Sequence, residues 1–87
     1  MPDEYSVVLR PSARRELDAL DIKIFEKILA KMDILKKVPR PPGTKKLLGR
    51  ENEYRFRVGD YRILYEIIDR EKTVRIFHVL HRREAYR

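Results

Sequence analysis

Cysteine is absent from the 87-residue sequence. Its absence excludes disulfide bonds, zinc–thiolate sites, iron–sulfur clusters and a cysteine nucleophile, and it is compatible with a reducing compartment. Glycine is rare, and the three glycines, at positions 43, 49 and 59, match neither a phosphate-binding loop nor a dinucleotide-binding fingerprint. We therefore expect no nucleotide cofactor.

A long apolar segment is absent as well. Charged residues make up 40% of the chain, which argues against a membrane span. The first residues, MPDEYS, have neither the basic nor the apolar region of a secretory signal, so a cytoplasmic location is expected. The length of 87 residues predicts one domain, residues 1–87, because a second hydrophobic core would not fit.

The common catalytic groups are scarce. The two histidines, His78 and His81, lie three residues apart on a predicted strand, so they should face opposite sides and cannot chelate one metal ion together. The two serines, Ser6 and Ser12, lie on a predicted strand and at a helix start, with no reason to meet an imidazole and a carboxylate. We therefore expect no metal, no other cofactor and no serine nucleophile.

Positive charge, in contrast, is abundant. Lysine and arginine number 21 against 14 acidic residues, a formal net charge of +7, which favours an anionic partner such as nucleic acid. Residues 1–44 contain nine basic and seven acidic residues, or +2, whereas residues 45–87 contain twelve and seven, or +5. Because arginine can bind phosphate through two parallel hydrogen bonds, phosphate chemistry is expected in the second half.

The N-terminal third predicts a strand and a short helix. Residues 5–9 are rich in β-branched and other strand-forming side chains, and this run ends before Pro11. Pro11 suits the first turn of a helix. Apolar residues then recur on one helix face: Ala13, Leu17 and Leu20.

A second, longer helix should begin after Asp21, whose side chain can cap it. Its apolar residues recur at intervals of three and four: Ile24, Phe25, Ile28, Leu29, Met32 and Leu35. Three prolines within residues 39–42 should end it by Val38. Residues 38–53 are then expected to be a connection.

The second half predicts three strands in a meander. Residues 54–58 alternate between an apolar face and a face that carries Arg55 and Arg57. Gly59-Asp60 predicts a two-residue hairpin turn, because glycine adopts the positive φ that such turns require. Residues 61–68 are typical of a central strand, since only Arg62 and Glu66 interrupt their apolar character, and residues 73–81 form the last strand.

The order β-α-α-β-β-β predicts an α+β domain in which both helices pack on one face of an antiparallel sheet. The first strand should pair at the sheet edge, because two helices separate it from the next strand. The opposite face is expected to be free and to carry Arg55 and Arg57. Residues 82–87 could add a terminal helical turn against the sheet.

The basic residues of the second half are interleaved with aromatic residues, which fits RNA. Phosphates attract guanidinium groups, bases stack on aromatic rings, and the RNA 2′-hydroxyl is an internal nucleophile that needs no metal. In a less specific interpretation, the arginines are solvated surface residues and the tyrosines belong to the core. The residues concerned are Arg55, Arg57, Arg62, Arg82, Arg83, Tyr54, Tyr61, Tyr65 and Tyr86.

The run ENEYRFRVGDYRILYEI, followed by a turn, a strand and the terminal HRREAYR, resembles the RelE/ParE superfamily of toxin–antitoxin toxins, and looks closest to the RelE branch. The resemblance spans nearly the whole chain. It implies a RelE-like fold and a cytoplasmic toxin that cleaves messenger RNA on the ribosome, inhibiting translation without metal, until a cognate antitoxin neutralises it. ParE relatives share the fold and inhibit DNA gyrase instead.

The resemblance also implies site residues. The family's two basic positions on one strand fall on Arg55 and Arg57, and its next-strand arginine falls on Arg62. The basic position after the last strand falls on Arg82 or its neighbour, and the C-terminal tyrosine falls on Tyr86. Further candidates for RNA contacts are Arg83, His81, Lys46 and Arg50.

Arginine does not release a proton near neutral pH, so it can stabilise phosphoryl charge but is a poor general acid. Proton transfer would then fall on Tyr86, on His81 or on ribosomal groups. The resulting hypothesis is a RelE-type, ribosome-dependent endoribonuclease in which Arg62 stabilises the transition state. Its rivals are a ParE-like gyrase inhibitor and an inactive or merely RNA-binding member.

The expected partner is an acidic, RelB-like antitoxin with an amphipathic helix, in a toxin–antitoxin hetero-oligomer. Its apolar residues would enter grooves beside Leu47-Leu48 and the two helices, while its carboxylates would meet the arginines. Messenger RNA and the ribosome are the other expected partners.

Overall fold

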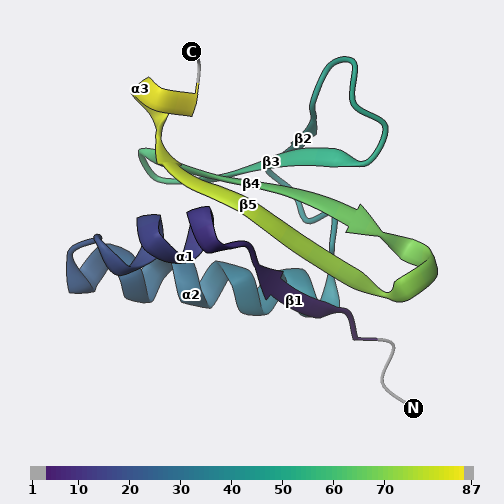
Figure 1. The fold of residues 1–87 in the computed structure, drawn as a ribbon, viewed down its shortest axis with the longest axis horizontal. Helices are drawn as coiled ribbons and strands as arrows, with labels where there is room; N and C mark the ends of the chain where they lie inside the picture. Colours follow the sequence, from purple (N-terminus) through teal and green to yellow (C-terminus); the bar gives the residue numbers. More distant parts are fainter. Residues whose placement is uncertain (1–3, 86–87) are drawn as a thin grey trace.

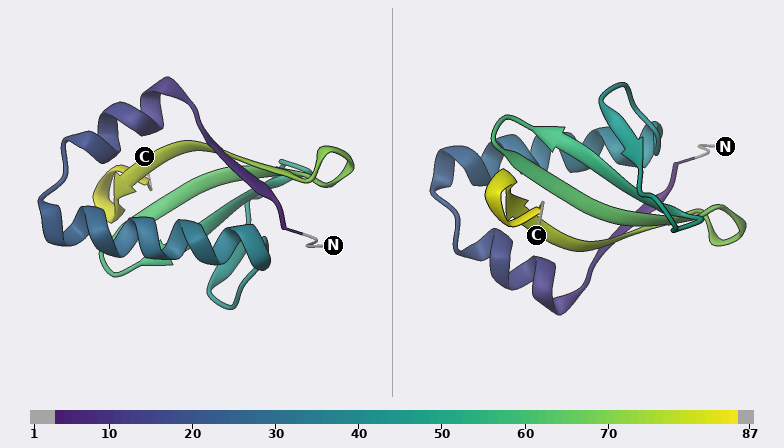
Figure 2. Two further views of the ribbon diagram at one scale, coloured as in Figure 1. Left: turned by 90° about the horizontal axis from the view of Figure 1, so that it is seen from below. Right: turned by 90° about the horizontal axis from the view of Figure 1, so that it is seen from above.

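Two helices, one of eight and one of sixteen residues, lie on one face of a five-stranded sheet, and a short helical turn lies on the other side (Figures 1 and 2). The structure is a computed structural model that describes residues 4–85, so Tyr86 lies outside the described residues. The elements, in chain order, are β1 (Ser6–Leu9), α1 (Pro11–Asp18), α2 (Ile22–Lys37), β2 (Thr44–Lys46), β3 (Glu53–Val58), β4 (Tyr61–Ile68), the 3₁₀ turn η1 (Asp69–Glu71), β5 (Thr73–His81) and α3 (Arg82–Ala85). No helix in the described part of the chain is long and apolar enough to cross a membrane.

The sheet has the strand order β1-β5-β4-β3-β2, with β4 at its centre. The predicted hairpin is confirmed: Val58 and Tyr61 are paired across the turn, and Gly59 has a φ of 60°. The first strand lies at the sheet edge, as expected, and runs parallel to β5. The sheet is therefore mixed, with one parallel pair beside an antiparallel meander.

The connection after α2 contains a strand that the sequence did not predict. Residues Thr44–Lys46 form β2, which pairs antiparallel with β3 and places Lys45 opposite Arg55. The main-chain N–H of Leu47 donates to the carbonyl of Glu53 over 2.8 Å and closes the loop between the two strands. The expectation of a plain connection over residues 38–53 is wrong at this point, because so short a strand depends on its partner rather than on its own apolar pattern.

Both helices begin and pack as the sequence predicts. Pro11 occupies the first turn of α1, and the Asp21 carboxylate caps α2 by accepting the Lys23 main-chain N–H over 2.9 Å. The buried residues of both helices meet the apolar face of the sheet in one core. That core comprises Ala13, Leu17, Ile28, Met32, Leu35, Phe56, Val58, Ile63, Tyr65, Ile67, Val74, Ile76 and Val79.

The outer edge of β5 is covered first by β1 and then by side chains of α1. The Ser12 hydroxyl donates to the carbonyl of Phe77 over 2.7 Å, and the Glu16 carboxylate accepts the main-chain N–H of Val79 over 2.9 Å. In the pairing of β5 with β4, Ile76 lies opposite Tyr65 and His78 lies opposite Leu64. Phe77 therefore has no partner residue on β4 and forms a β-bulge. This bulge allows Phe77 and His78 to line the same hollow, although they are consecutive on a strand.

Candidate nucleic-acid interface

The predicted strand arginines lie together on the sheet face away from α1 and α2. Arg57 is the cross-strand neighbour of Arg62, and Arg55 is the neighbour of Lys45. These four side chains, together with Gly43, line one hollow of about 240 Å³. The sequence pattern did not indicate Lys45, because its place beside Arg55 depends on the unpredicted strand β2. We call this hollow the cationic hollow.

Arg62 is the most deeply held of these cations. Only 6% of the residue is exposed, and its Nη1 donates to the carbonyls of Tyr61, over 3.0 Å, and Gly59, over 3.3 Å. The Nε of Arg57 donates to the same Gly59 carbonyl over 3.3 Å. The hairpin turn thus accepts hydrogen bonds from both guanidinium groups and helps to fix their positions before any ligand binds.

The end of β5 lies beside this hairpin. The main-chain N–H of Arg82 donates to the Asp60 carbonyl over 2.7 Å, which fixes the start of α3 against the turn. Arg82 and Arg83 are exposed there. His81 is the cross-strand neighbour of Tyr61, and the two rings meet edge to face with their centroids 5.3 Å apart. The Nδ1 of His81 accepts a hydrogen bond from the main-chain N–H of Arg83 over 3.3 Å. Strand alternation therefore places His81 on the opposite face from Arg62.

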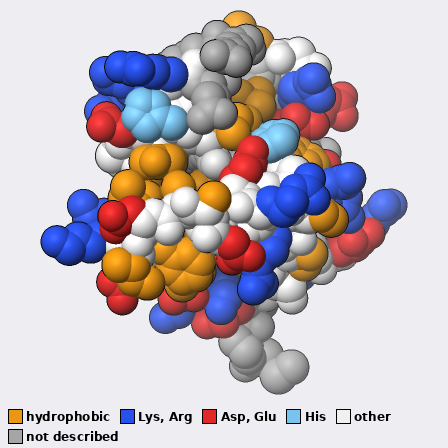
Figure 3. Space-filling model, turned by 60° about the vertical axis from the view of Figure 1, so that its left-hand side comes forward, with side chains coloured by type: hydrophobic (Ala, Val, Ile, Leu, Met, Phe, Trp, Pro, Cys, Tyr) orange, Lys and Arg blue, Asp and Glu red, His pale blue; other side chains and the backbone are white. Residues whose placement is uncertain are grey.

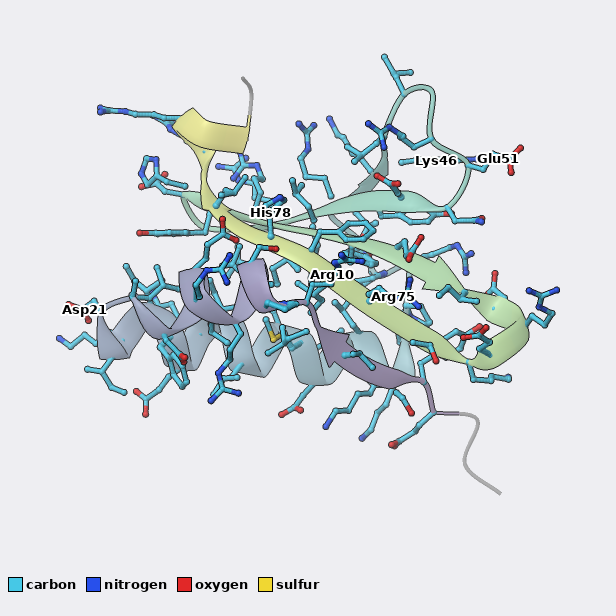
Figure 4. The ribbon with its side chains drawn as sticks, viewed as in Figure 1. Arg10, Asp21, Lys46, Glu51, Arg75 and His78 are labelled. Atoms are coloured by element: carbon cyan, nitrogen blue, oxygen red, sulfur yellow. The ribbon has the colours of Figure 1, made fainter. Side chains whose placement is uncertain are left out.

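The remaining two sequence-predicted residues lie outside the cationic hollow. Lys46 pairs with Tyr54, so alternation turns it away from the face that carries Lys45. Arg50 belongs to the loop between β2 and β3 and is paired with Glu53, with 3.4 Å between Nη1 and Oε2. Figure 4 shows Lys46 and Glu51 on the β2–β3 segment, apart from Arg75 and His78 on β5.

A second hollow, of about 600 Å³, lies on the same face, where its lining residue Leu64 is the cross-strand neighbour of Arg55. It combines apolar walls with ion-paired groups, and its lining residues are Leu47, Leu48, Arg50, Glu53, Leu64, Phe77 and His78. The Nδ1 of His78 lies 3.1 Å from a carboxylate oxygen of Glu16 on α1. The sequence predicted an apolar groove beside Leu47-Leu48, and both residues line this hollow. It did not indicate Phe77 and His78, whose place here depends on the bulge in β5.

The tyrosines at the other end of the sheet are structural. Tyr65 is fully buried, its hydroxyl donates to the Pro39 carbonyl over 2.8 Å, and burial raises the pKa of its phenol to about 12. Tyr54 stacks on Tyr65 with ring centroids 5.9 Å apart. The interpretation of these two tyrosines as core or edge residues is confirmed.

Arg40 connects these tyrosines to the β4–β5 turn. Its Nη2 donates to Asp69 over 2.9 Å and its Nε to the Tyr54 hydroxyl over 3.0 Å. The hydrogen bond from Arg40, followed by that from Tyr5, lowers the pKa of the Asp69 carboxyl. These contacts fix the segment that leads into β2, and therefore the position of Lys45. Within residues 4–85, no three histidine, aspartate or glutamate side chains are grouped as metal ligands.

Comparison with known proteins assigns the family. Over residues 7–86, the sequence matches the model of a family described as the ParE toxin of the type II toxin–antitoxin system parDE. The chain belongs to this family. It is accordingly a type II toxin of the RelE/ParE superfamily, as the sequence resemblance indicated. Among curated proteins, none matches the sequence.

Solved structures of the superfamily share the fold. In the archaeal RelE–RelB complex from Pyrococcus horikoshii OT3, a chain with 28% identity superposes with a TM-score of 0.81 over 91% of this chain and 96% of that one. A chain of the RelBE2 toxin–antitoxin complex from Mycobacterium tuberculosis has 33% identity and a TM-score of 0.78, over 90% and 98% of the two chains. The YoeB/ParE toxin from Agrobacterium tumefaciens, at 17% identity, shares the fold with a TM-score of 0.76 over 87% and 96%. The predicted RelE-like fold is confirmed.

Proposed function

We propose that this toxin is a RelE-type endoribonuclease that cleaves messenger RNA on the ribosome and so inhibits translation. The observation that supports this activity is the cationic hollow, where three arginines and one lysine from three strands converge on a single open site. A site of this size and charge fits one phosphodiester group, and hydrogen bonds to the hairpin hold two of its guanidinium groups in place.

The proposed reaction begins with attack by a ribose 2′-oxygen on the adjacent phosphorus. The new 2′-oxygen–phosphorus bond forms as the bond from phosphorus to the 5′-oxygen of the next nucleotide breaks. A proton leaves the 2′-hydroxyl and a proton reaches the departing 5′-oxygen, so the products are a 2′,3′-cyclic phosphate and a 5′-hydroxyl. Arg62, Arg55 and Arg57 would stabilise the negative charge that builds up on the phosphoryl oxygens.

Proton transfer needs other groups, because a guanidinium does not release its proton near neutral pH. The cationic hollow is lined by one lysine and three arginines. Of these four side chains, Lys45 is the one that can transfer a proton. Tyr86 stays the sequence-based candidate for this role. Arg82, whose main-chain N–H is bound to the hairpin, would add charge at the same end of the sheet in this proposal.

The test is cleavage of messenger RNA on programmed ribosomes with purified toxin, combined with mapping of 5′ ends on translated messages after expression in cells. We expect cuts within translated frames and products that carry a 2′,3′-cyclic phosphate and a 5′-hydroxyl. A 5′-phosphate at the cut would contradict 2′-hydroxyl attack. Absence of any cleavage on ribosomes would contradict the proposed activity altogether.

A ParE-type inhibitor of DNA gyrase is the second candidate function, and the match to the ParE toxin model favours it. Such a protein binds its target without hydrolysis, so the cationic hollow would serve only as a contact surface. A supercoiling assay with purified gyrase separates the two candidates. Inhibition of gyrase at toxin concentrations that leave ribosome-bound messages intact would favour the ParE-type activity.

The proposed protein partner is an acidic antitoxin with an amphipathic helix. Solved structures of two superfamily members are complexes with RelB antitoxins. On this toxin, a groove of about 250 Å³ lies between β1 and α2, with Leu29 and Met32 among its lining residues. Apolar side chains also surface among charges of both signs on the flank that Figure 3 shows.

Co-purification with the product of an adjacent small reading frame tests this partner. We expect Leu29→Glu to weaken the complex, because 39% of Leu29 is exposed beside the groove and the partner would then have to bury a carboxylate in place of an apolar side chain. Added salt should slow association more than it speeds dissociation. A toxin that shows no affinity for that product would contradict the proposal.

A further inference from the structure

A histidine and a glutamate form a fixed pair where α1 covers the edge of β5. The Nδ1 of His78 lies 3.2 Å and 3.1 Å from the two carboxylate oxygens of Glu16. The same carboxylate accepts the main-chain N–H of Val79 over 2.9 Å. Figure 4 shows His78 on β5, beside α1. Neither His78 nor Glu16 is among the site residues that the sequence indicated.

This pair determines which nitrogen of the imidazole carries the proton. An ionised carboxylate only accepts hydrogen bonds, so the Nδ1 of His78 must donate to Glu16. In the neutral imidazole, the other nitrogen, Nε2, is then the acceptor and can take up a proton. An imidazole whose tautomer is fixed by a carboxylate is the arrangement that a general base requires.

His78 lies in the same row of the sheet as two residues of the cationic hollow. Lys45 is the cross-strand neighbour of Arg55, and Arg55 is the neighbour of Leu64. Leu64 in turn is the neighbour of His78. Directly opposite residues share one face of a sheet, and strands are about 4.8 Å apart, so the Cα atoms of Lys45 and His78 are about 14 Å apart.

Cleavage by a 2′-hydroxyl needs proton transfer on two sides of one phosphate. The attacking 2′-oxygen and the departing 5′-oxygen lie roughly in line through the phosphorus. One group therefore removes a proton on one side, and another supplies a proton on the other side. In the row of the sheet, Lys45 and His78 lie on opposite sides of Arg55, which lines the cationic hollow. The structure thus provides one group for each side.

We propose that His78 is the general base of the cleavage reaction and that Glu16 is its positioning residue. This inference rests on the proposed ribonuclease function. The Nε2 of His78 takes the proton of the 2′-hydroxyl while the bond from the 2′-oxygen to phosphorus forms, and Glu16 stabilises the resulting imidazolium. Lys45 gives a proton to the 5′-oxygen as the bond from phosphorus to that oxygen breaks. Proton exchange with water then restores both side chains.

The other charged side chains on this part of the sheet leave Glu16 as the partner of His78. Two of them are carboxylates that are already ion-paired, Glu53 at 3.4 Å from its arginine and Glu66 at 2.7 Å. Among the described residues, Glu16 is the carboxylate within hydrogen-bond distance of His78. The charged side chains concerned are Arg10, Arg50, Glu53, Arg62, Glu66 and Arg75.

The first test is the pH dependence of single-turnover cleavage on programmed ribosomes. We expect the wild-type rate to rise with pH between about 5 and 8, because only the neutral imidazole accepts a proton. His78→Gln can still donate a hydrogen bond to Glu16, but it should lose this rise and cleave about 10²-fold more slowly or worse. A wild-type rate that stays constant over this range, or a wild-type rate in His78→Gln, would overturn the assignment.

Added imidazole separates a missing base from a missing structural contact. In His78→Ala, free imidazole should restore part of the rate, because 44% of the His78 side chain is exposed and its place is open to solvent. The same concentration should not restore Arg62→Ala, which lacks a cation instead of a base. Thermal melting checks that both variants are folded. A folded His78→Ala that imidazole does not rescue would contradict the role of His78 as the base.

Glu16→Gln tests the positioning role. The amide oxygen can still accept the Val79 main-chain N–H, but the side chain no longer fixes the tautomer of His78, so cleavage should slow by about 10-fold or more. The loss should vanish when His78→Gln is already present. Glu26→Gln is the matched control, because Glu26 is exposed on α2 and the charge changes by the same amount. It should cleave as the wild type does.

The outcomes distinguish this inference from the proposed function. If the losses in Glu16→Gln and His78→Gln multiply in the double variant, Glu16 does not act through His78 and its positioning role is wrong. If wild-type toxin cleaves and the His78 variants cleave equally fast, the base lies elsewhere and the ribonuclease activity stands. Absence of cleavage by wild-type toxin would overturn both.

Discussion

Replacement of Arg62 by alanine should abolish most of the cleavage activity while leaving the protein folded. Arg62 lies on the central strand, with Arg57 and Leu80 as its cross-strand neighbours, and is only 6% exposed. Its guanidinium is thus held at the proposed phosphate site rather than extended into the solvent. Loss of one preorganised donor of this kind costs about 10²- to 10³-fold in rate.

The effect of Arg62→Ala on stability should be much smaller. The variant loses two hydrogen bonds from a charged donor to main-chain carbonyls, each worth about 1.5–3 kcal/mol. It also removes a nearly buried cation from beside three others. Two like charges about 6 Å apart repel by about 3 kcal/mol at an effective dielectric constant of about 20. The two effects have opposite signs and similar sizes, so we expect the variant to stay folded and its free energy of unfolding to change by less than either effect alone.

Single-turnover cleavage on programmed ribosomes measures the rate, and thermal or urea unfolding measures the stability. Arg14→Ala is the control, because Arg14 lies on α1, its side chain is 67% exposed and it only pairs with Asp18 along the helix. Its loss should change the stability by less than about 0.5 kcal/mol and leave the rate unchanged. Equal rate losses in Arg62→Ala and Arg14→Ala would refute the reasoning, since the arginines would then act only as a diffuse attractive field.

Three further predictions concern single side chains. Lys45→Arg keeps the charge of the cationic hollow but removes the one lysine that lines it, so single-turnover cleavage should slow by about 10²-fold; a wild-type rate would exclude Lys45 from proton transfer. Tyr86→Phe should slow cleavage less than Arg62→Ala does, because the ring stays available for stacking, and a larger loss in the same assay would contradict this order. Because burial raises the pKa of Tyr65 to about 12, the unfolded chain releases this proton first as the pH rises above about 10, and stability should fall by about 1–2 kcal/mol between pH 10 and 12. Tyr65→Phe should lose this alkaline slope in urea titrations, and an unchanged slope would assign it to another group.

The elements that sequence analysis predicted well are those that local chemistry specifies. Asp21 caps α2, Pro11 begins α1, and Gly59 supplies the positive φ of the hairpin, each through interactions within a few residues. The alternation of apolar and basic residues along β3 also determines which face is cationic. For this reason the sequence alone predicts that Arg55 and Arg57 share one face of the sheet.

The parts that were missed depend on contacts distant in sequence. Strand β2 exists because β3 offers it an edge, and Lys45 joins the site only through that pairing. A groove beside Leu47-Leu48 was expected, but its walls of Phe77 and His78 depend on a bulge against β4, which no local pattern encodes. His81 lies on the opposite face from Arg62 for a related reason, since the register pairs it with Tyr61.

The two-residue turn at Gly59 has a consequence for how such a toxin can be controlled. Arg55, Arg57 and Arg62 sit on adjoining strands of one tight hairpin, and the turn's own carbonyl holds two of them. No hinge separates these three cations, so a domain movement cannot pull them apart without unfolding the hairpin. The three arginines therefore stay together whenever the hairpin is folded. If the proposed cleavage takes place at these arginines, an inhibitor has to mask the hairpin or withdraw a group supplied from outside it.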